Sequence, residues 1–413
     1  MEYQNLRVNG RRLQESLEEM ARIGATEGGG VHRLALSEED KQARDLFVKW
    51  LQEIGLKVTI DDMGNIFGRR PGKKDDLPSV MCGSHIDTQP KGGRFDGILG
   101  VMGGLEVLRT LNDNEIETLR SIVVANWTNE EGTRFSPPMA GSGVWTGKLD
   151  KHWIYDRTDM QGKKFGEELE RIGYKGNILS KPDPIYAYFE YHIEQGPVLE
   201  KENMIIGAPE GIVGMRWCDV YVSGTANQVG PTPMEGRNDA LCAAAEMILT
   251  INALPQKMGG NMVATVGEIH NFPNSRNIIP DHVHFTVDIR SWDDDRSQSA
   301  WIDAKENFQA IANRRGCSVR IEETWQVDHM PFDQRLVTRV LDTAQQLGYP
   351  VLKMRSGAGH DAGYLSMVAP TAMIFVPSIG GRSHVEVENT KWEDCESGAN
   401  VLLQCMLQCA MEA

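Results

Sequence analysis

Apolar residues recur at helical spacing near the start of the chain. This spacing predicts two amphipathic helices, over residues 9–23 and 38–54. The segment that follows, over residues 55–70, has two short strand-like runs on either side of a turn at 63–65, and it predicts a pair of strands. The chain therefore opens as a mixed α/β fold.

Three later apolar runs are short, bounded by turn residues and separated by helical segments. They lie at residues 79–82, 121–127 and 372–376, and a helix is expected at 98–111. Runs of this kind are typical of strands that are buried on both faces of a sheet. We therefore expect an α/β domain with a central, largely parallel sheet covered by helices.

The pattern changes between residues 213 and 321. The elements expected there are strands at 217–222, 262–269, 282–290 and 318–321 and helices at 239–254 and 296–312. The order β-α-β-β-α-β favours a compact α+β sandwich inserted into the first domain. We expect one domain from residues 1–210 and 326–413, and an inserted domain from residues 211–325.

Composition narrows the choice of class. The 413 residues are 40% hydrophobic and 24% charged, as in ordinary globular proteins, and the length suits two domains. The net charge of -15 disfavours nucleic acid and anionic membranes as partners. The seven cysteines are scattered without a CxxC pair, and no apolar stretch approaches a membrane span, so we expect a cytoplasmic protein with reduced thiols.

Candidate chemistry begins at the end of the predicted strand at 79–82, in the segment GSHIDT. His85 is a metal-ligand candidate there, and Asp87 is placed to orient its ring through the second nitrogen. The glycines around Asp96 allow that carboxylate to be carried back to the same strand end. Taken alone, this pattern equally suits a capped strand end.

Two adjacent acids, Glu130 and Glu131, follow the predicted strand at 121–127. Two neighbouring carboxylates beside a buried strand are costly unless a positive group shares the site. A metal ion resolves the conflict if one carboxylate binds it and the other takes a proton from its water. The alternative is a solvated helix N-terminus, which also favours acids.

Other histidines lie in turns beside predicted strands. They are His192 in HIEQGP, His360 in SGAGHDA and His384 in GGRSH. Open α/β sheets build their sites at such turns, so His192 and His384 join the metal-ligand candidates. Ligation by nitrogen and oxygen alone suits zinc, manganese, cobalt or nickel, and the sequence does not choose among them.

These residues, in this order, resemble the hydantoinase/carbamoylase group of dinuclear metal-dependent amidases over essentially the whole chain. The motifs that carry the resemblance are GSHIDT, GGRFDGILGV, NEEGTRF, HIEQGPVLE, GPTPM, RNIIP, SGAGHDA and GGRSH. The group includes N-carbamoyl-L-amino-acid hydrolases, beta-ureidopropionases and allantoate amidohydrolases. The resemblance implies a metallopeptidase-like catalytic domain, and an inserted domain that acts as lid and homodimer interface.

The resemblance also implies roles for individual residues. One of two divalent ions would be held by His85, Asp96 and His192, and the other by Asp96, Glu131 and His384. Glu130 would be the general base in hydrolysis of a ureido C–N bond, which yields an amino acid, CO2 and NH3. The substrate would be a small ureido or amide acid.

The substrate carboxylate would be bound by Gln195, Asn277 and Arg290, with Gly359 and His360 near the pocket. A guanidinium is a natural bidentate partner of a carboxylate. From the residues alone, a surface ion pair at a strand end is the favoured interpretation of Arg290, and Asn277 equally suits a turn.

The chain departs from the group at Gln228, where relatives typically have a histidine that polarises the scissile carbonyl. An amide still donates a hydrogen bond to a developing oxyanion, but it carries no charge. Three activities stay open on the sequence: ureido hydrolysis, hydrolysis of an ordinary amide by an aminoacylase or dipeptidase, and ligand binding with weakened or no turnover.

Overall fold

The computed structural model describes residues 3–413, and its chain divides into two compact units. We call Met1–Gly211 together with Pro331–Ala413 the outer unit, and Ile212–Met330 the inserted unit. The inserted unit ends five residues later than the boundary expected from sequence. The reason is that its last strand continues to Val327.

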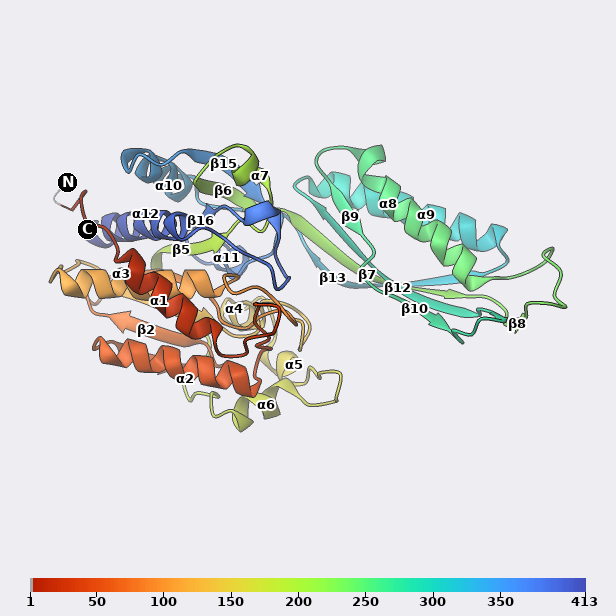
Figure 1. The fold of residues 1–413 in the computed structure, drawn as a ribbon, viewed down its shortest axis with the longest axis horizontal. Coiled ribbons are helices and arrows are strands. Elements are labelled where there is room, and N and C mark those ends of the chain that lie inside the picture. Colours follow the sequence, from red (N-terminus) through yellow and green to blue (C-terminus); the bar gives the residue numbers. More distant parts are fainter. Residues whose placement is uncertain (1–2) are drawn as a thin grey trace. The chain divides into compact units, whose positions relative to one another are not determined.

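A nine-stranded mixed sheet forms the centre of the outer unit, with the order β1-β2-β4-β3-β5-β16-β6-β14 and β15 beside β6 (Figure 1). The strands are β1 Lys57–Ile60, β2 Ile66–Arg70, β3 Ser79–His85, β4 Ile122–Trp127, β5 Ile185–Ile193, β6 Ile206–Ile212, β14 Met330–Pro331, β15 Val351–Ser356 and β16 Thr371–Val376. Strands β4, β3, β5 and β16 pair in parallel. Strands β1 and β2 at one side, and β6 at the other, pair antiparallel. The expected α/β sheet is therefore confirmed, with its parallel part at the centre.

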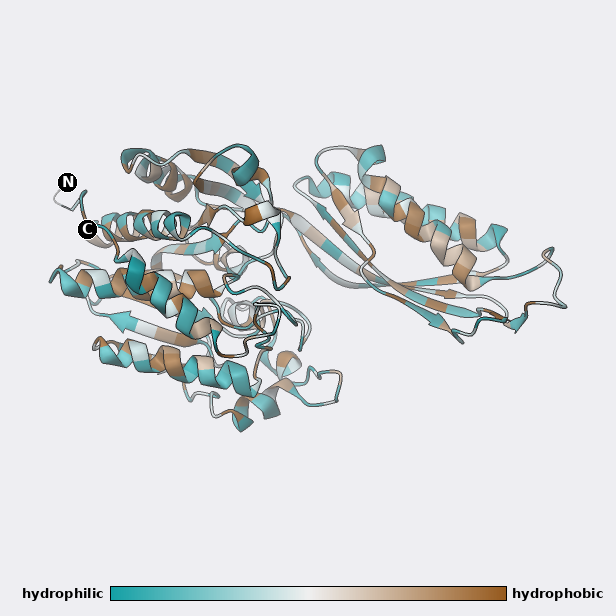
Figure 2. Cartoon of the chain, in the orientation of Figure 1, coloured by the Kyte–Doolittle hydropathy of each residue, from teal (hydrophilic) through white to brown (hydrophobic). Residues whose placement is uncertain are grey.

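Helices cover this sheet. They are α1 Gly10–Ala21, α2 Glu38–Glu53, α3 Ile98–Asp113, α4 Ala140–Trp145, α5 Lys151–Tyr155, α6 Phe165–Arg171, α7 Val198–Lys201, α10 Gln334–Gln346, α11 Asp361–Leu365 and α12 Trp392–Met411, with a 3-10 turn η1 at Ile379–Gly381. Helices α3 and α12 contact each other and strands β3 and β5, and most of their residues are buried. Figure 2 shows polar residues on α1 and α2, which bury only one face.

Local signals explain where these helices begin. The side chain of Ser37 accepts a hydrogen bond from the backbone of Asp40 at the start of α2, and acidic residues fill the first turn. Among the described residues, no helix has both the length and the apolar composition that crossing a membrane requires.

The parallel strands place their carboxyl ends at one edge of the sheet. Strand β3 ends at His85, β4 at Trp127 and β5 at Ile193, and in register His85 lies opposite Trp127. Segments that follow such strands converge in space although they are far apart in sequence. This edge therefore gathers the motifs that the sequence analysis selected.

The inserted unit packs two helices on one face of a five-stranded antiparallel sheet with the order β10-β12-β7-β13 and β9 beside β12. Its elements are β7 Gly214–Ser223, β8 Asn227–Gln228, α8 Ala240–Met258, β9 Val263–Thr265, β10 Ile269–Phe272, β11 Ile278–Ile279, β12 His282–Ser291, α9 Asp294–Arg314 and β13 Ser318–Val327. Its core includes Phe285, Trp301 and Phe308.

The single strand expected at 262–269 is wrong in detail. The structure has two short strands instead, β9 and β10, and the backbone N–H of Glu268 between them donates to the hydroxyl of Thr286 at 3.1 Å. Strands β8 and β11 form a separate two-stranded ribbon.

Candidate metal centre

The carboxyl edge of the outer sheet brings together the six residues around which the sequence analysis built its metal site. Two groups place one donor atom from each member within 4.8 Å of the others. The first is His85, Asp96 and His192, and the second is Asp96, Glu131 and His384. Asp96 belongs to both groups.

The two oxygens of Asp96 face different histidines. Its Oδ1 lies 3.2 Å from Nε2 of His192 and 3.7 Å from Nε2 of His85, and its Oδ2 lies 3.2 Å from Nε2 of His384. Glu131 completes the second group at 3.7 Å from His384. Donors bound about 2.0–2.2 Å from a tetrahedral ion lie about 3.4 Å apart, so both groups have the spacing that a divalent cation requires.

Backbone carbonyls fix the tautomers of the two buried histidines. Nδ1 of His85 contacts the carbonyl oxygen of Asp87 at 2.9 Å, and Nδ1 of His192 contacts that of Ile193 at 2.9 Å. Each ring then donates from Nδ1 and directs Nε2 toward Asp96. The orientation of both rings is thus set by the backbone.

Asp87 acts differently from the sequence expectation. Its carboxylate lies 3.8 Å from the ring of His85, so its backbone carbonyl orients that ring instead. The carboxylate accepts the backbone N–H groups of Glu130 and Glu131, each at 3.2 Å. Asp87 therefore positions the two acids as well as the histidine.

Gly97 is required by close packing against His85. Its φ is +68°, and a Cβ atom at this position would lie 2.3 Å from Nε2 of His85. Its backbone N–H points at Nε2 of His192, 3.1 Å away. A side chain here would displace a metal-facing nitrogen.

Sequence reasoning missed two residues that hold the acids in place. Glu388 is 2% exposed, and its carboxylate accepts the backbone N–H groups of Phe95 and Asp96 at 3.1 and 3.0 Å. Gln89 donates from its backbone and its side chain to Glu131, at 3.1 and 2.7 Å. The only sequence signal for Glu388 was its place four residues after His384.

Burial and neighbouring carboxylates disfavour the charged forms of both glutamates at this centre. Burial raises the pKa of Glu131 to about 7, with the carboxylate of Asp96 adding to the effect. Burial also raises the pKa of Glu130 well above its ordinary value, and His85 offsets this only in part. A divalent cation between these carboxylates would stabilise their charged forms. The donor set and its charge therefore fit such an ion.

Glu130 lies beside the first group without belonging to either. Its Oε2 is 3.5 Å from Nε2 of His85, and the residue is 7% exposed. This leaves a buried carboxylate at the edge of the ligand groups, in a position to exchange a proton with a molecule bound there.

Gln195 and His360 also reach this edge. The Gln195 amide donates to Oδ2 of Asp96 at 2.9 Å, and its buried Oε1 has no hydrogen-bond partner among the described residues. The ring of His360 lies 4.5 Å from that of His192, and burial lowers its pKa well below the ordinary value, so the ring is neutral. Gly359 precedes it on the loop between β15 and α11.

A third group of possible ligands, Glu190, His192 and His360, also has suitable spacing. It shares His192 with the first group. One nitrogen of that ring bonds to the carbonyl of Ile193 and the other faces Asp96, so His192 serves one group only.

The remaining candidates belong to the inserted unit, and the structure does not bring all three together. Gln228 on β8 pairs with Ile278 on β11, and the N–H of Val229 donates to the carbonyl of Asn277 at 3.0 Å, so Gln228 and Asn277 share the ribbon. Both are exposed.

Arg290 lies near the far end of β12 and binds Asp288 at 2.8 Å. The ribbon joins β12 at its other end, at His282. Eight residues of strand at about 3.3 Å each separate His282 from Arg290 by about 26 Å. Within one copy, Arg290 and the ribbon that carries Gln228 and Asn277 are therefore too far apart to contact the same small substrate.

Comparison with known proteins identifies the family of this chain. Residues 81–408 match the model of peptidase family M20/M25/M40. The chain is 44% identical, over 98% of both chains, to the N-carbamoyl-L-amino-acid amidohydrolase of Rhizobium meliloti, and 31% identical to the allantoate amidohydrolase of Bacillus subtilis over 99% of this chain and all of that one. A crystal structure of a hydantoinase/carbamoylase family amidase from Burkholderia vietnamiensis superposes with a TM-score of 0.94 at 46% identity, over 99% of both chains. The chain therefore belongs to peptidase family M20/M25/M40 and, within it, to the hydantoinase/carbamoylase amidases.

Proposed function

We propose that this protein hydrolyses the ureido C–N bond of an N-carbamoyl amino acid, or of a related ureido acid. The observation that carries the proposal is the buried Asp96, which faces one ligand group with each oxygen while Glu130 lies beside them. Full-length relatives named for ureido hydrolysis support the choice of bond.

Enzymes of this family are metal-dependent, and this chain has residue groups able to bind metal. We propose two divalent ions, with His85, Asp96 and His192 holding one and Asp96, Glu131 and His384 the other. Nitrogen and oxygen donors suit zinc, manganese, cobalt or nickel. When bound, such ions would polarise the scissile carbonyl and lower the pKa of a water molecule.

The chain's own residues would move the protons. Glu130 takes a proton from the attacking water and passes it to the departing nitrogen. One water and one ureido group give ammonia and a carbamate, and the carbamate then loses CO2 to leave the free amino acid. Asp87 supports this step, because it fixes the backbone that carries Glu130.

Recognition of the substrate would fall to neutral and cationic groups. We propose Arg290, Asn277 and Gln195 as partners of the substrate carboxylate, with Gly359 and His360 lining the pocket. Gln228 would donate an amide hydrogen bond to the developing oxyanion. That bond is weaker than one from a charged histidine.

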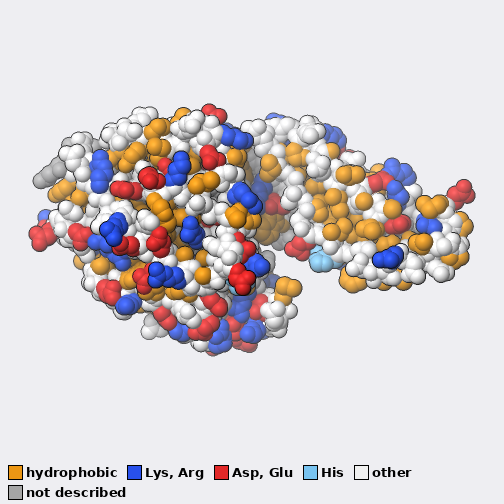
Figure 3. Space-filling model, viewed as in Figure 1, with side chains coloured by type: hydrophobic (Ala, Val, Ile, Leu, Met, Phe, Trp, Pro, Cys, Tyr) orange, Lys and Arg blue, Asp and Glu red, His pale blue; other side chains and the backbone are white. Residues whose placement is uncertain are grey.

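We further propose that the protein is a homodimer through its inserted unit. The separation of Arg290 from the ribbon supports this, because one copy presents only one of the two groups to a given small substrate. Apolar side chains also reach the surface on α8 and α9 (Figure 3), among them Leu249 at 65% and Ile302 at 44% exposure. The seven free thiols favour a reducing compartment, and we propose the cytoplasm.

The test is turnover of metal-loaded protein on matched substrates. N-carbamoyl-L-amino acids, their D-enantiomers, allantoate and N-acetyl amino acids would be compared by release of ammonia and of free amino acid. Ammonia from the carbamoyl or ureido acids, abolished in Glu130→Gln, is the expected result. Cleavage of N-acetyl amino acids alone would instead establish ordinary amide hydrolysis. Tight binding of carbamoyl acids without turnover would establish a ligand-binding form.

A further inference from the structure

A cavity of about 290 Å³ lies in the outer unit, away from the candidate metal centre. Its lining includes Ser79, where β3 begins, and Ser121, just before β4, whereas His85 ends β3 at the metal centre. Along β3, Ser79 lies six residues, or about 20 Å, from His85, and Met81 lies four residues, or about 13 Å, from it. None of the proposed metal ligands lines the cavity, so it is a separate feature.

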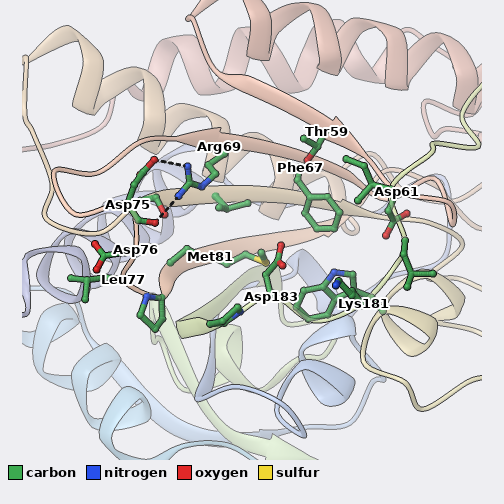
Figure 4. A pocket seen from close by; sticks show the side chains of 18 residues that line it. Thr59, Asp61, Phe67, Arg69, Asp75, Asp76, Leu77, Met81, Lys181 and Asp183 are labelled. Carbon is green, nitrogen blue, oxygen red and sulfur yellow. Dashed lines mark hydrogen bonds and ion pairs between the residues drawn. The ribbon is translucent and has the colours of Figure 1, made fainter.

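The floor of the cavity is apolar. Phe67, Met81 and Val123 lie on neighbouring strands, with Met81 directly opposite Val123 in register. Trp145 of α4 adds a second aromatic ring 6.5 Å from that of Phe67. Figure 4 shows Phe67 and Met81 across the floor. Such a surface suits an apolar side chain of a small ligand.

A stiff segment presents one cation and one anion at the rim. In Ser180-Lys181-Pro182-Asp183-Pro184, both charged residues precede a proline, which favours extended backbone at each. Lys181 and Asp183 are two residues apart, so they project to the same side about 6.5 Å apart at Cα. Both line the cavity, and Figure 4 labels them among the residues around it.

These two charges are not neutralised by the protein. Lys181 and Asp183 are both exposed to solvent, and within residues 3–413 neither forms a salt bridge with another side chain, so each is free to meet a ligand. The other cation of the lining, Arg69, is already bound to Asp75 at 3.0 Å. A ligand that carries both an ammonium and a carboxylate on one carbon would satisfy both rim groups.

We propose that this cavity binds a free α-amino acid with an apolar side chain. The ammonium of the ligand lies at Asp183, its carboxylate at Lys181, and its side chain over Phe67, Met81 and Trp145. Because the prolines fix the segment beforehand, little ordering cost opposes binding. The proposal does not depend on the catalytic activity of the other edge.

The test is calorimetric titration of the full, metal-loaded chain with L-leucine, L-methionine and L-phenylalanine. Leucinamide, which lacks the carboxylate, and 4-methylpentanoate, which lacks the ammonium, are the matched probes. We expect each analogue to bind about tenfold or more weakly than leucine, because each loses one charged hydrogen bond. Asp183→Asn and Lys181→Gln should weaken leucine binding to a similar extent.

Controls separate this site from binding at the metal centre. Asp342→Asn and Lys49→Gln remove exposed charges on α10 and α2 and should bind leucine as the parent does. Equal unfolding temperatures would show that all four variants are folded. The proposal is overturned if no amino acid binds at millimolar concentration, or if leucinamide binds as well as leucine. It is also overturned if Asp183→Asn and Lys181→Gln keep the parent affinity, since the amino acid then binds elsewhere.

Discussion

Replacing Gly97 with alanine should disable the metal centre by moving a single nitrogen. The new Cβ would lie 2.3 Å from Nε2 of His85, and ordinary contact begins at 3.4 Å, so the ring or the loop must shift by 1.1 Å. Metal sites tolerate errors of about 0.2 Å in ligand distance. The shift therefore exceeds the tolerance several times over.

The backbone adds a second cost, because φ at Gly97 is +68°. A non-glycine residue in such a region costs about 1–3 kcal/mol. Gly147→Ala is the matched control, since Gly147 has φ +76° and nothing within 4 Å of the added Cβ. It carries the strain of a positive φ without the collision.

Metal affinity distinguishes the two effects. Protein dialysed against graded chelator would be analysed for bound metal, and its unfolding temperature measured in parallel. We expect Gly97→Ala to bind metal at least about 100-fold more weakly, beyond the 10- to 100-fold loss typical when a supporting residue is removed. Gly147→Ala should keep its metal. If Gly97→Ala retains the parent affinity, then His85 is not a ligand or the loop adapts freely, and the argument from close packing fails.

Four other substitutions test separate parts of the site and fold. Glu130→Gln should keep bound metal and lose about 10²- to 10⁴-fold in kcat, and substantial residual turnover would remove it as the base. Arg290→Ala should raise KM for carboxylate substrates about 10- to 100-fold with a smaller effect on kcat, and an unchanged KM would contradict a carboxylate contact. Gln228→His should raise kcat about tenfold if this side chain meets the oxyanion, so a flat or lower kcat speaks against that role. Burial alone would raise the pKa of Asp159, but hydrogen bonds from backbone N–H groups and from Arg134 hold that pKa below its ordinary value. The contact between Arg134 and Asp159 therefore stabilises the fold above about pH 4. Its contribution is lost as the pH falls through the lowered pKa of the folded state. Arg134→Gln should therefore lower the free energy of unfolding by about 2 kcal/mol at neutral pH, and by less in acid. If the substitution lowers the free energy of unfolding equally at neutral and acid pH, the lowered pKa of Asp159 is not the cause.

The sequence pointed to the residues of the candidate metal centre because they lie in short motifs at strand ends. His85 and Glu131 follow buried strands predicted from the sequence, His192 lies in β5, and the parallel centre of the sheet brings these ends together. Supporting contacts were harder to predict, because they depend on backbone groups. The contact of His85 with the carbonyl of Asp87, in place of its carboxylate, leaves no trace in residue type.

The inserted unit shows the same limit at a larger scale. Its alternation of strands and helices was predictable from periodicity, yet the break between β9 and β10 was not, since it depends on a bond to Thr286 of another strand. The distance between Arg290 and the ribbon follows from the length and register of β12. Comparing motifs one by one assigns Arg290 and the ribbon to the same substrate site, because motifs carry no information about the distance between them.

The Asp87 carboxylate has a consequence for redesign of this enzyme. Because one side chain anchors the backbone of both Glu130 and Glu131, a substitution that shifts one acid shifts its neighbour too. Substitutions in this loop that aim to change the basicity of Glu130 would therefore also weaken metal binding through Glu131. Libraries aimed at new substrates are better directed at the exposed ribbon of the inserted unit, where no shared anchor links specificity to the ligands.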